Sequence, residues 1–217
     1  MTAKLLSLII SIPGILIAFS VHEYAHAKMA YKLGDSTPKF QGRLTLNPIA
    51  HVDIIGFLMI LIMNFGWAKP VEINKKAFKN PRRDDLKVSI AGPLANLITG
   101  IIIMAIIVIL NKIFNINNAT TPYILFLNIL VTAAELNILL FFLNLVPIPG
   151  FDGYHILGDL FPKLSNDLSA KFEAYWIFIF IFLMIPIPFL GNSVFYYIVH
   201  LPTVKFLSLL SKFFAMI

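Results

Sequence analysis

The chain has 217 residues, of which 59% are hydrophobic and only 13% are charged, and its formal net charge is +6. Soluble domains are about 45–50% apolar and about 25% charged, so this composition excludes both an ordinary water-soluble enzyme and a disordered chain. The chain has no cysteine, which excludes disulfides, thiolate zinc ligands and a cysteine nucleophile.

Long apolar runs predict an all-α, polytopic membrane protein with about five to six transmembrane helices, since a spanning helix needs about 20 mostly apolar residues. The first run, residues 5–21, carries no charge and continues helically to residue 30. The other candidate spans are residues 88–110, 123–148, 174–190 and, more weakly, 193–217.

Residues 49–66 form a shorter apolar segment. Only about 13 residues after Asp53 lack charge, which is too few to span a membrane comfortably. We therefore expect a short re-entrant or β-like hairpin, or a peripheral segment, in place of a full crossing.

The basic residues are concentrated in one part of the chain. Eleven of the 17 Lys and Arg residues lie between residues 28 and 87, whereas residues 111–122 hold only Lys112. The positive-inside rule places residues 28–87 in the cytoplasm and residues 111–122 outside. Topology signalling and contact with lipid headgroups explain this charge, so we expect a lipid bilayer and no nucleic acid as the partner.

His22, Glu23 and His26 form an H-E-x-x-H motif inside the first helical run. Residues four apart share a helix face, so both imidazoles can bind one metal ion, and Glu23 is placed to take a proton from water at that ion. Ionisable residues next to a charge-free apolar run are energetically expensive and are usually functional. The motif predicts a hydrolytic zinc (Zn2+) site.

A catalytic zinc site needs a third protein ligand and one open position. Asp152 is favoured because it lies in residues 144–153, a stretch with two prolines and two glycines that interrupts a membrane helix. Irregular backbone at membrane depth is tolerated only inside the protein or around a wet cavity. His155, one turn beyond Asp152, is the main rival, and the remaining candidate ligands are His51, Asp53, Glu72, Glu135, Asp159 and His200.

The predicted topology allows this pairing. His22 and His26 lie at the cytoplasmic end of the first span. The chain from His26 to Asn144 returns to that side if two of the predicted spans cross the membrane and residues 49–66 do not. We therefore expect a multi-pass protein of a prokaryotic cell membrane with its site near the cytoplasmic face.

Further motifs accompany H-E-Y-A-H at residues 22–26. The segments are Asn47-Pro48-x-x-His51-x-Asp53-x-x-Gly56, Gly66-Trp67-Ala68-Lys69-Pro70-Val71, Ala91-Gly92-Pro93-x-x-Asn96 and residues 144–153. Together they resemble the site-2 protease family of intramembrane zinc metalloproteases, over residues 22–153 and in the right order. The resemblance implies a core of three spans, zinc bound by His22, His26 and Asp152, and Glu23 as the general base.

Three further residues are candidates for substrate binding or transition-state support. Asn144 could hydrogen-bond the substrate backbone or the oxyanion, or else pack between helices. His51 could support the metal ligands through a hydrogen bond. Asn47 lies at the entrance of the hairpin, where an Asn-Pro pair also suits a turn.

Two other matched segments have structural interpretations. We expect Gly92, Pro93 and Asn96 to serve helix start and helix packing rather than catalysis. Residues 66–71, next to the short apolar segment, could offer a strand edge to an extended substrate.

We therefore expect a single integral membrane metalloprotease domain over residues 1–217, with a catalytic core at 1–155, gating helices at 170–217, and no PDZ or CBS domain. Its expected activity is zinc-dependent cleavage of a peptide bond in or near a transmembrane segment of a membrane protein substrate. The alternatives are a metal transporter, an inactive relative that binds membrane segments, and a hydrolase of a non-peptide substrate. The sequence leaves the oligomeric state open.

Overall fold

A computed structural model describes residues 3–63, 66–114, 120–189 and 191–216. Its α-helices are α1 (Ala3–Lys32), α2 (Thr37–Phe40), α3 (Ile54–Met63), α4 (Pro81–Ile113), α5 (Thr121–Asn144), α6 (Asp152–Leu160), α7 (Pro162–Met184) and α8 (Leu201–Ala215), with single 3-10 turns at Pro48–Ala50 and Lys75–Ala77. The described residues form no strand beyond isolated antiparallel bridges, so the predicted all-α class is confirmed.

Four helical segments are long and apolar enough to cross a membrane: Leu5–Lys32, Pro81–Ile113, Thr121–Asn144 and Tyr196–Ala215. The last one joins a π-helical turn, Tyr196–His200, to α8. The predicted span at residues 174–190 corresponds to a shorter apolar helix, Ala174–Met184. The described residues therefore hold four candidate spans where about five to six were expected.

Prolines determine where two helices end. α5 ends at Asn144, earlier than predicted, because Pro147 disfavours helical backbone in the residue before it. α7 ends at Met184 because Ile185 precedes Pro186 and takes an extended conformation, with φ −72° and ψ 128°. The irregular chain after α5 leads directly to Asp152.

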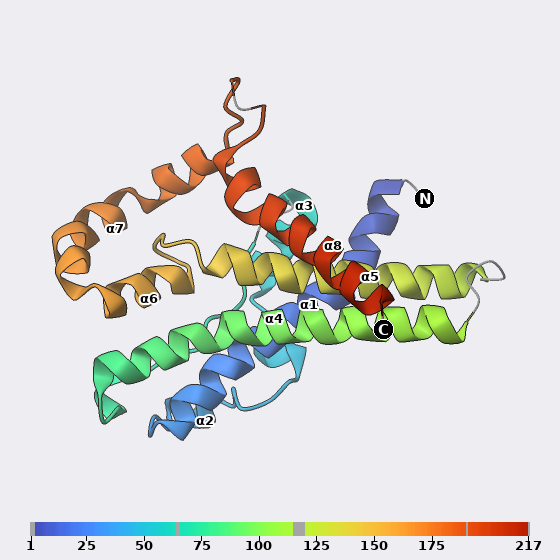
Figure 1. The fold of residues 1–217 in the computed structure, drawn as a ribbon. Coiled ribbons are helices and arrows are strands. Elements are labelled where there is room, and N and C mark those ends of the chain that lie inside the picture. Colours follow the sequence, from blue (N-terminus) through green and yellow to red (C-terminus); the bar gives the residue numbers. More distant parts are fainter. Residues whose placement is uncertain (1–2, 64–65, 115–119, 190, 217) are drawn as a thin grey trace.

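Helices α1, α4 and α5 pack together as the core of the molecule (Figure 1). Small residues allow a close approach: a Cβ on Gly14 of α1 would lie 2.9 Å from the Cα atom of Ala133 in α5. Ile103 and Ile107 of α4 are buried against Ala133 and Ala134. This arrangement agrees with the three core spans that the sequence motifs imply.

The short apolar segment turns back on itself. α3 has ten residues and a length of about 15 Å, half of what a membrane requires. On either side of it, Val52 forms an antiparallel bridge with Ala68, and the Lys69 N–H donates to the His51 carbonyl at 2.9 Å. The segment is therefore a hairpin too short to span, which is one of the two alternatives to a full crossing that the sequence predicts.

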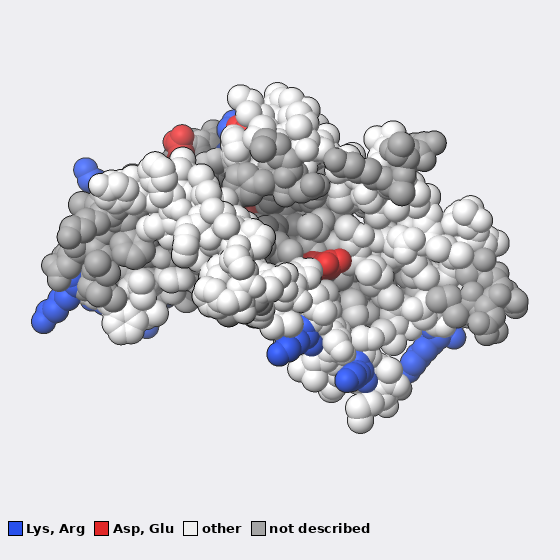
Figure 2. Space-filling model, turned by 90° about the horizontal axis from the view of Figure 1, so that it is seen from above, with Lys and Arg blue, Asp and Glu red and all other residues white. Residues whose placement is uncertain are grey.

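The outer surface is mostly apolar. Figure 2 shows one face on which uncharged side chains prevail and the Lys and Arg side chains lie toward the margins. Large apolar residues of the spans face outward, including Ile102 and Ile109 of α4, which are 52% and 54% exposed. Such a surface suits contact with lipid rather than water.

Candidate metal centre

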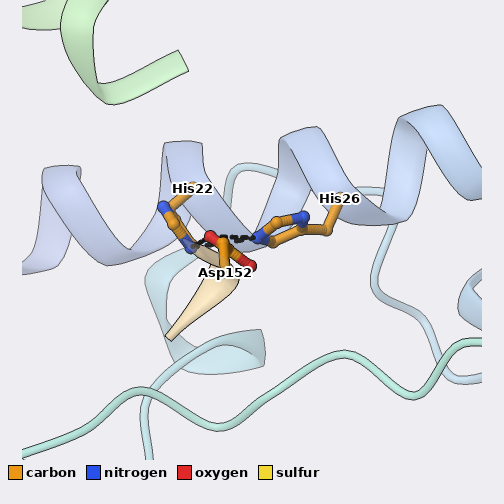
Figure 3. Close-up of side chains that lie close together, drawn as sticks. All are labelled: His22, His26 and Asp152. Atoms are coloured by element: carbon orange, nitrogen blue, oxygen red, sulfur yellow. Dashed lines mark hydrogen bonds and ion pairs between the residues drawn. The ribbon is translucent and has the colours of Figure 1, made fainter. Parts of the chain in front are cut away.

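The two histidines of the H-E-x-x-H motif meet on one face of α1. Their spacing of four residues brings the Nε2 atoms of His22 and His26 to 3.0 Å from each other, and both side chains are buried. The third member comes from a distant part of the chain. Asp152, the first residue of α6, places Oδ2 at 3.2 Å from His22 Nε2 and 3.3 Å from His26 Nε2 (Figure 3).

Two glycines shape the chain that presents Asp152. Gly150 has a φ of +99°, a left-handed conformation that side chains disfavour. A Cβ on Gly153 would lie 2.5 Å from the Leu145 carbonyl oxygen, so the turn after α5 can close only with glycine at this position. Both glycines belong to residues 144–153, the stretch in which the sequence predicts an interrupted helix.

Hydrogen bonds fix the orientation of both imidazoles. Nδ1 of His26 donates to the Val88 carbonyl of α4 at 2.8 Å, and Nδ1 of His22 donates to Asn96 Oδ1 at 2.6 Å. With the hydrogen on Nδ1, each Nε2 atom presents a lone pair. Asp152 Oδ2 is buried and has no hydrogen-bond donor among the described residues. Three acceptor atoms therefore converge on one point.

Such a convergence fits a zinc ion. His22, His26 and Asp152 are the group of described residues that could hold a metal. A tetrahedral zinc site with metal–ligand distances of about 2.0–2.1 Å has edges of about 3.3 Å between ligand atoms. The observed separations of 3.0, 3.2 and 3.3 Å are close to one face of that tetrahedron, which leaves the fourth position open.

The space beside the two imidazoles requires a glycine at position 92 of α4. A Cβ on Gly92 would overlap Nε2 of His26 and would lie 2.7 Å from Cε1 of His22. The sequence predicts a role for Gly92 in helix start and packing, whereas in the structure Gly92 lies directly against both imidazoles. Only a residue without a side chain leaves this space to the imidazoles.

Asn96, which the sequence predicts to serve helix packing, also supports a ligand, because it accepts the hydrogen bond from His22. Its Nδ2 donates to the Ala18 carbonyl at 2.9 Å and to Asn137 Oδ1 at 3.0 Å, while Asn137 Nδ2 donates to the Ala133 carbonyl at 2.8 Å. Both asparagines are fully buried. Their amides fix the acceptor that His22 requires, and the signal in the sequence was a polar amide inside an apolar span.

Glu23 is buried beside the ligands. Its Oε2 accepts a hydrogen bond of 2.9 Å from the Val71 N–H, which belongs to the segment after the hairpin. Glu23 is not one of the three clustered acceptors. A carboxylate in this place can accept a proton from a molecule held in the open position.

A cavity of about 570 Å³ connects these groups. Besides the three ligands and Glu23, its lining includes Phe19, Trp67, Leu140, Leu143, Asn144 and His155. Asn144 donates to the Leu140 carbonyl at 3.0 Å within α5. Desolvation, together with the nearby charge of Lys75, lowers the pKa of the His155 imidazole.

His51 and Asn47 are not brought to the cavity. His51 is fully buried, and its Nε2 bonds the Thr45 carbonyl at 2.7 Å. The Asn47 side chain accepts from the Ile49 N–H at 3.1 Å and begins a 3-10 turn. Their predicted roles in catalysis remain predictions, and their contacts are those of a scaffold around the hairpin.

The rival ligands lie in other surroundings. Asp53 accepts from the Gly56 N–H at 2.8 Å, Glu72 accepts from Gln41 at 2.7 Å, and the His200 ring lies 5.1 Å from the ring of Tyr196. His155 lines the cavity but does not belong to the convergent group.

Comparisons with known proteins agree with this geometry. The family described as "Peptidase family M50" matches residues 10–123 and 110–187. The chain is 40% identical over 173 residues to "Putative zinc metalloprotease YwhC" of Bacillus subtilis (strain 168), covering 79% of this chain and 78% of the relative.

Two mycobacterial relatives match over a similar length. The chain is 27% identical over 191 residues to "Putative zinc metalloprotease Rip2" of Mycolicibacterium smegmatis, covering 85% of this chain and 69% of the relative. It is 30% identical over 183 residues to the protein of the same name in Mycobacterium tuberculosis (strain ATCC 25618 / H37Rv), covering 81% and 66%. No solved structure shows significant similarity.

Proposed function

Because the chain belongs to peptidase family M50, and is thus a multi-pass membrane zinc metalloprotease, we propose that it cleaves a peptide bond in or near a transmembrane segment of another membrane protein. The observation that carries this proposal is the convergence of His22, His26 and Asp152 at a helix long and apolar enough to span a membrane, beside the buried Glu23. A site on such a helix can reach a peptide bond of a substrate segment that lies in the bilayer.

Each polar group has a proposed role. His22, His26 and Asp152 would hold zinc, which would act as a Lewis acid and lower the pKa of bound water to about 7. Glu23 takes the proton of the attacking water and later delivers it to the leaving amine. The Val71 N–H holds the Glu23 carboxylate in the cavity during both transfers.

Asn144 is the candidate for binding the substrate backbone or the oxyanion. It lines the cavity from the last turn of α5, and its amide N–H is at present bonded to a carbonyl of its own helix. A rotation of this side chain would direct the amide into the cavity. For Asn47 and His51 we propose indirect support, through the hairpin that they stabilise.

Substrate access is proposed from two sides. Residues 66–71 offer a chain edge to an extended peptide, and all of them except Lys69 line the cavity. A helical substrate would have to unwind locally to use this edge. The C-terminal helices, within residues 170–217, are interrupted by Pro186, Pro188 and Pro202 and are suited to act as a gate. The basic residues at 28–87 support a site near the cytoplasmic face of the cell membrane.

The proposal is tested by a cleavage assay with the purified full chain and reporter transmembrane segments in liposomes. The wild type should cut the reporter, a zinc chelator should stop cleavage, and added zinc should restore it. Glu23→Gln should abolish cleavage and still bind zinc. Cleavage by Glu23→Gln would refute the role of Glu23, and a wild type that binds reporters and zinc but cuts nothing would indicate an inactive relative.

A further inference from the structure

Arg43 is a buried cation whose hydrogen-bond partners are backbone carbonyls. Arg43 is only 4% exposed. Nη1 donates to the Ala50 and Lys69 carbonyls at 2.6 and 3.0 Å, and Nη2 donates to the Pro70 carbonyl at 2.8 Å. Burying a guanidinium without a carboxylate partner is costly unless its donors are satisfied, so these carbonyls are held firmly.

The bonded carbonyls come from both sides of the hairpin. Ala50 precedes α3, whereas Lys69 and Pro70 follow it. The segments before and after α3 are also joined by the hydrogen bond from the Lys69 N–H to the His51 carbonyl. They approach so closely that a Cβ on Gly56 would overlap the Trp67 carbonyl. Arg43 therefore ties the segment after α3 to the segment before it.

One peptide group of the segment that follows α3 is hydrogen-bonded to Glu23. The Pro70 carbonyl and the Val71 N–H belong to the same planar peptide unit. Arg43 binds the oxygen of this unit at 2.8 Å, and Glu23 accepts from its N–H at 2.9 Å. The peptide cannot rotate without breaking both bonds, and a cation at the oxygen polarises the N–H toward the carboxylate.

We propose that Arg43 is a positioning residue for Glu23, acting through the Pro70–Val71 peptide. It orients that peptide so that the Val71 N–H holds the Glu23 carboxylate in the geometry required of the base. This inference rests on the proposed function, in which Glu23 moves the proton. Arg43 itself touches neither the three clustered ligands nor Glu23 in the described contacts.

Lysine is the informative replacement. It keeps the positive charge but has a single nitrogen, which cannot replace a planar guanidinium bonded to three carbonyls. Arg43→Lys should lower kcat per bound zinc roughly 10- to 100-fold, as loss of a supporting hydrogen bond does at metal sites, with a smaller change in KM. Arg83→Lys, at an exposed arginine of α4, is the matched control and should retain wild-type kcat.

Amide hydrogen exchange provides a measurement that does not depend on activity. In the zinc-loaded full chain, Arg43→Lys and Glu23→Ala should both speed the exchange of the Val71 amide. Glu23→Gln and Arg83→Lys should leave it protected, because a glutamine oxygen still accepts the bond. The Lys69 amide, bonded to His51, should stay protected in Glu23→Ala.

The outcomes separate this inference from the proposed function. An Arg43→Lys variant with wild-type kcat per zinc overturns the inference and leaves the protease assignment intact. An Arg43→Lys variant that loses zinc and activity in the same proportion, with Val71 still protected in the zinc-loaded fraction, also overturns it, since Arg43 then serves only stability. If the wild type cuts nothing, the protease assignment fails. The exchange rate of the Val71 amide then still decides whether Arg43 orients the Pro70–Val71 peptide.

Discussion

The helical core and helix α7 use apolar sequence in different ways. In the core of α1, α4 and α5, the polar side chains of Asn96 and Asn137 are fully buried and bonded to one another. On α7, by contrast, Tyr175, Phe178 and Phe182 are 60–68% exposed. α7 packs against α6 and is not part of the three-helix core (Figure 1).

This difference shows which contacts determine how the helices pack. Between helices in lipid, close packing and a few buried hydrogen bonds determine which faces meet, because apolar side chains gain nothing by leaving the hydrocarbon. The core therefore depends on single atoms, whereas the outward face of α7 needs only to be apolar. Substitutions in the two regions should differ in effect by orders of magnitude.

The largest effect is expected from Gly92→Ala. The new methyl group would occupy the space of His26 Nε2, so the ligands could not converge. We expect loss of zinc binding and of cleavage, measured by metal content and the reporter assay. Gly100→Ala on the same helix is the control, because its methyl would overlap the side chain of Ile138 and none of the ligands, and it should reduce stability without removing zinc. Stoichiometric zinc in Gly92→Ala would contradict the geometry.

A large effect is also expected at Asn96, and two replacements divide its roles. Asn96→Ala removes the acceptor of His22 Nδ1 and should weaken zinc binding roughly 10- to 100-fold. Asn96→Asp keeps an acceptor and should bind zinc with near wild-type affinity. It loses the donors to Ala18 and Asn137 and should therefore melt at a lower temperature.

The measurements for Asn96 are a competition titration with a chromophoric chelator and a thermal melt. Asn137→Ala, one hydrogen bond further from the metal, should show a smaller loss of affinity than Asn96→Ala. Equal zinc affinities for Asn96→Ala and Asn96→Asp would contradict the assigned tautomer of His22.

A moderate, pH-dependent effect is expected at the far end of α6. Arg82 of α4 donates to the Asp159 and Leu160 carbonyls and fastens this helix. Burial and the nearby Asp85 raise the pKa of Asp159 to about 6, although Lys75 and Arg82 oppose the shift. A raised pKa means that the folded state favours the proton, so stability is greatest below the unfolded pKa and falls as the pH rises through about 6.

Asp159→Asn should remove this loss. We expect its melting temperature to exceed that of the wild type by a few degrees at pH 8 and by little at pH 4, a modest change because the group is partly exposed. A gain of the same size at both pH values would show that the carboxylate charge is not the cause.

The sequence was informative where chemistry is local or rare. His22 and His26 are related by helical periodicity, and Asp152 lies in a stretch whose prolines and glycines mark a break, so their convergence could be anticipated. The length of residues 49–66 likewise predicted a hairpin. These signals need no knowledge of which helices touch.

The missed residues act across long separations. Asn96 and His22 are 74 positions apart, and Glu23 and Val71 are 48 apart. No periodicity relates such pairs, so Arg43, Asn96 and Asn137 gain their roles only when the packing is known. The available warning was an asparagine in an apolar span, at Asn96 and at Asn137, since a buried amide there requires a partner.

The smallest effect is expected from Phe178→Leu on the outward face of α7. Phe178 is 68% exposed, so leucine should keep the same apolar surface, with stability within about 0.5 kcal/mol of the wild type and unchanged zinc content and kcat.

Phe180, two residues further along α7, provides the matched comparison. Its ring lies 6.0 Å from the ring of Phe151, the residue before Asp152, and such a pair contributes about 0.5–1.5 kcal/mol. Phe180→Leu should therefore lower the melting temperature more than Phe178→Leu, in parallel melts of the zinc-loaded protein. If Phe178→Leu lowered the melting temperature more, the outward face of α7 would make specific stabilising contacts, as the core helices do.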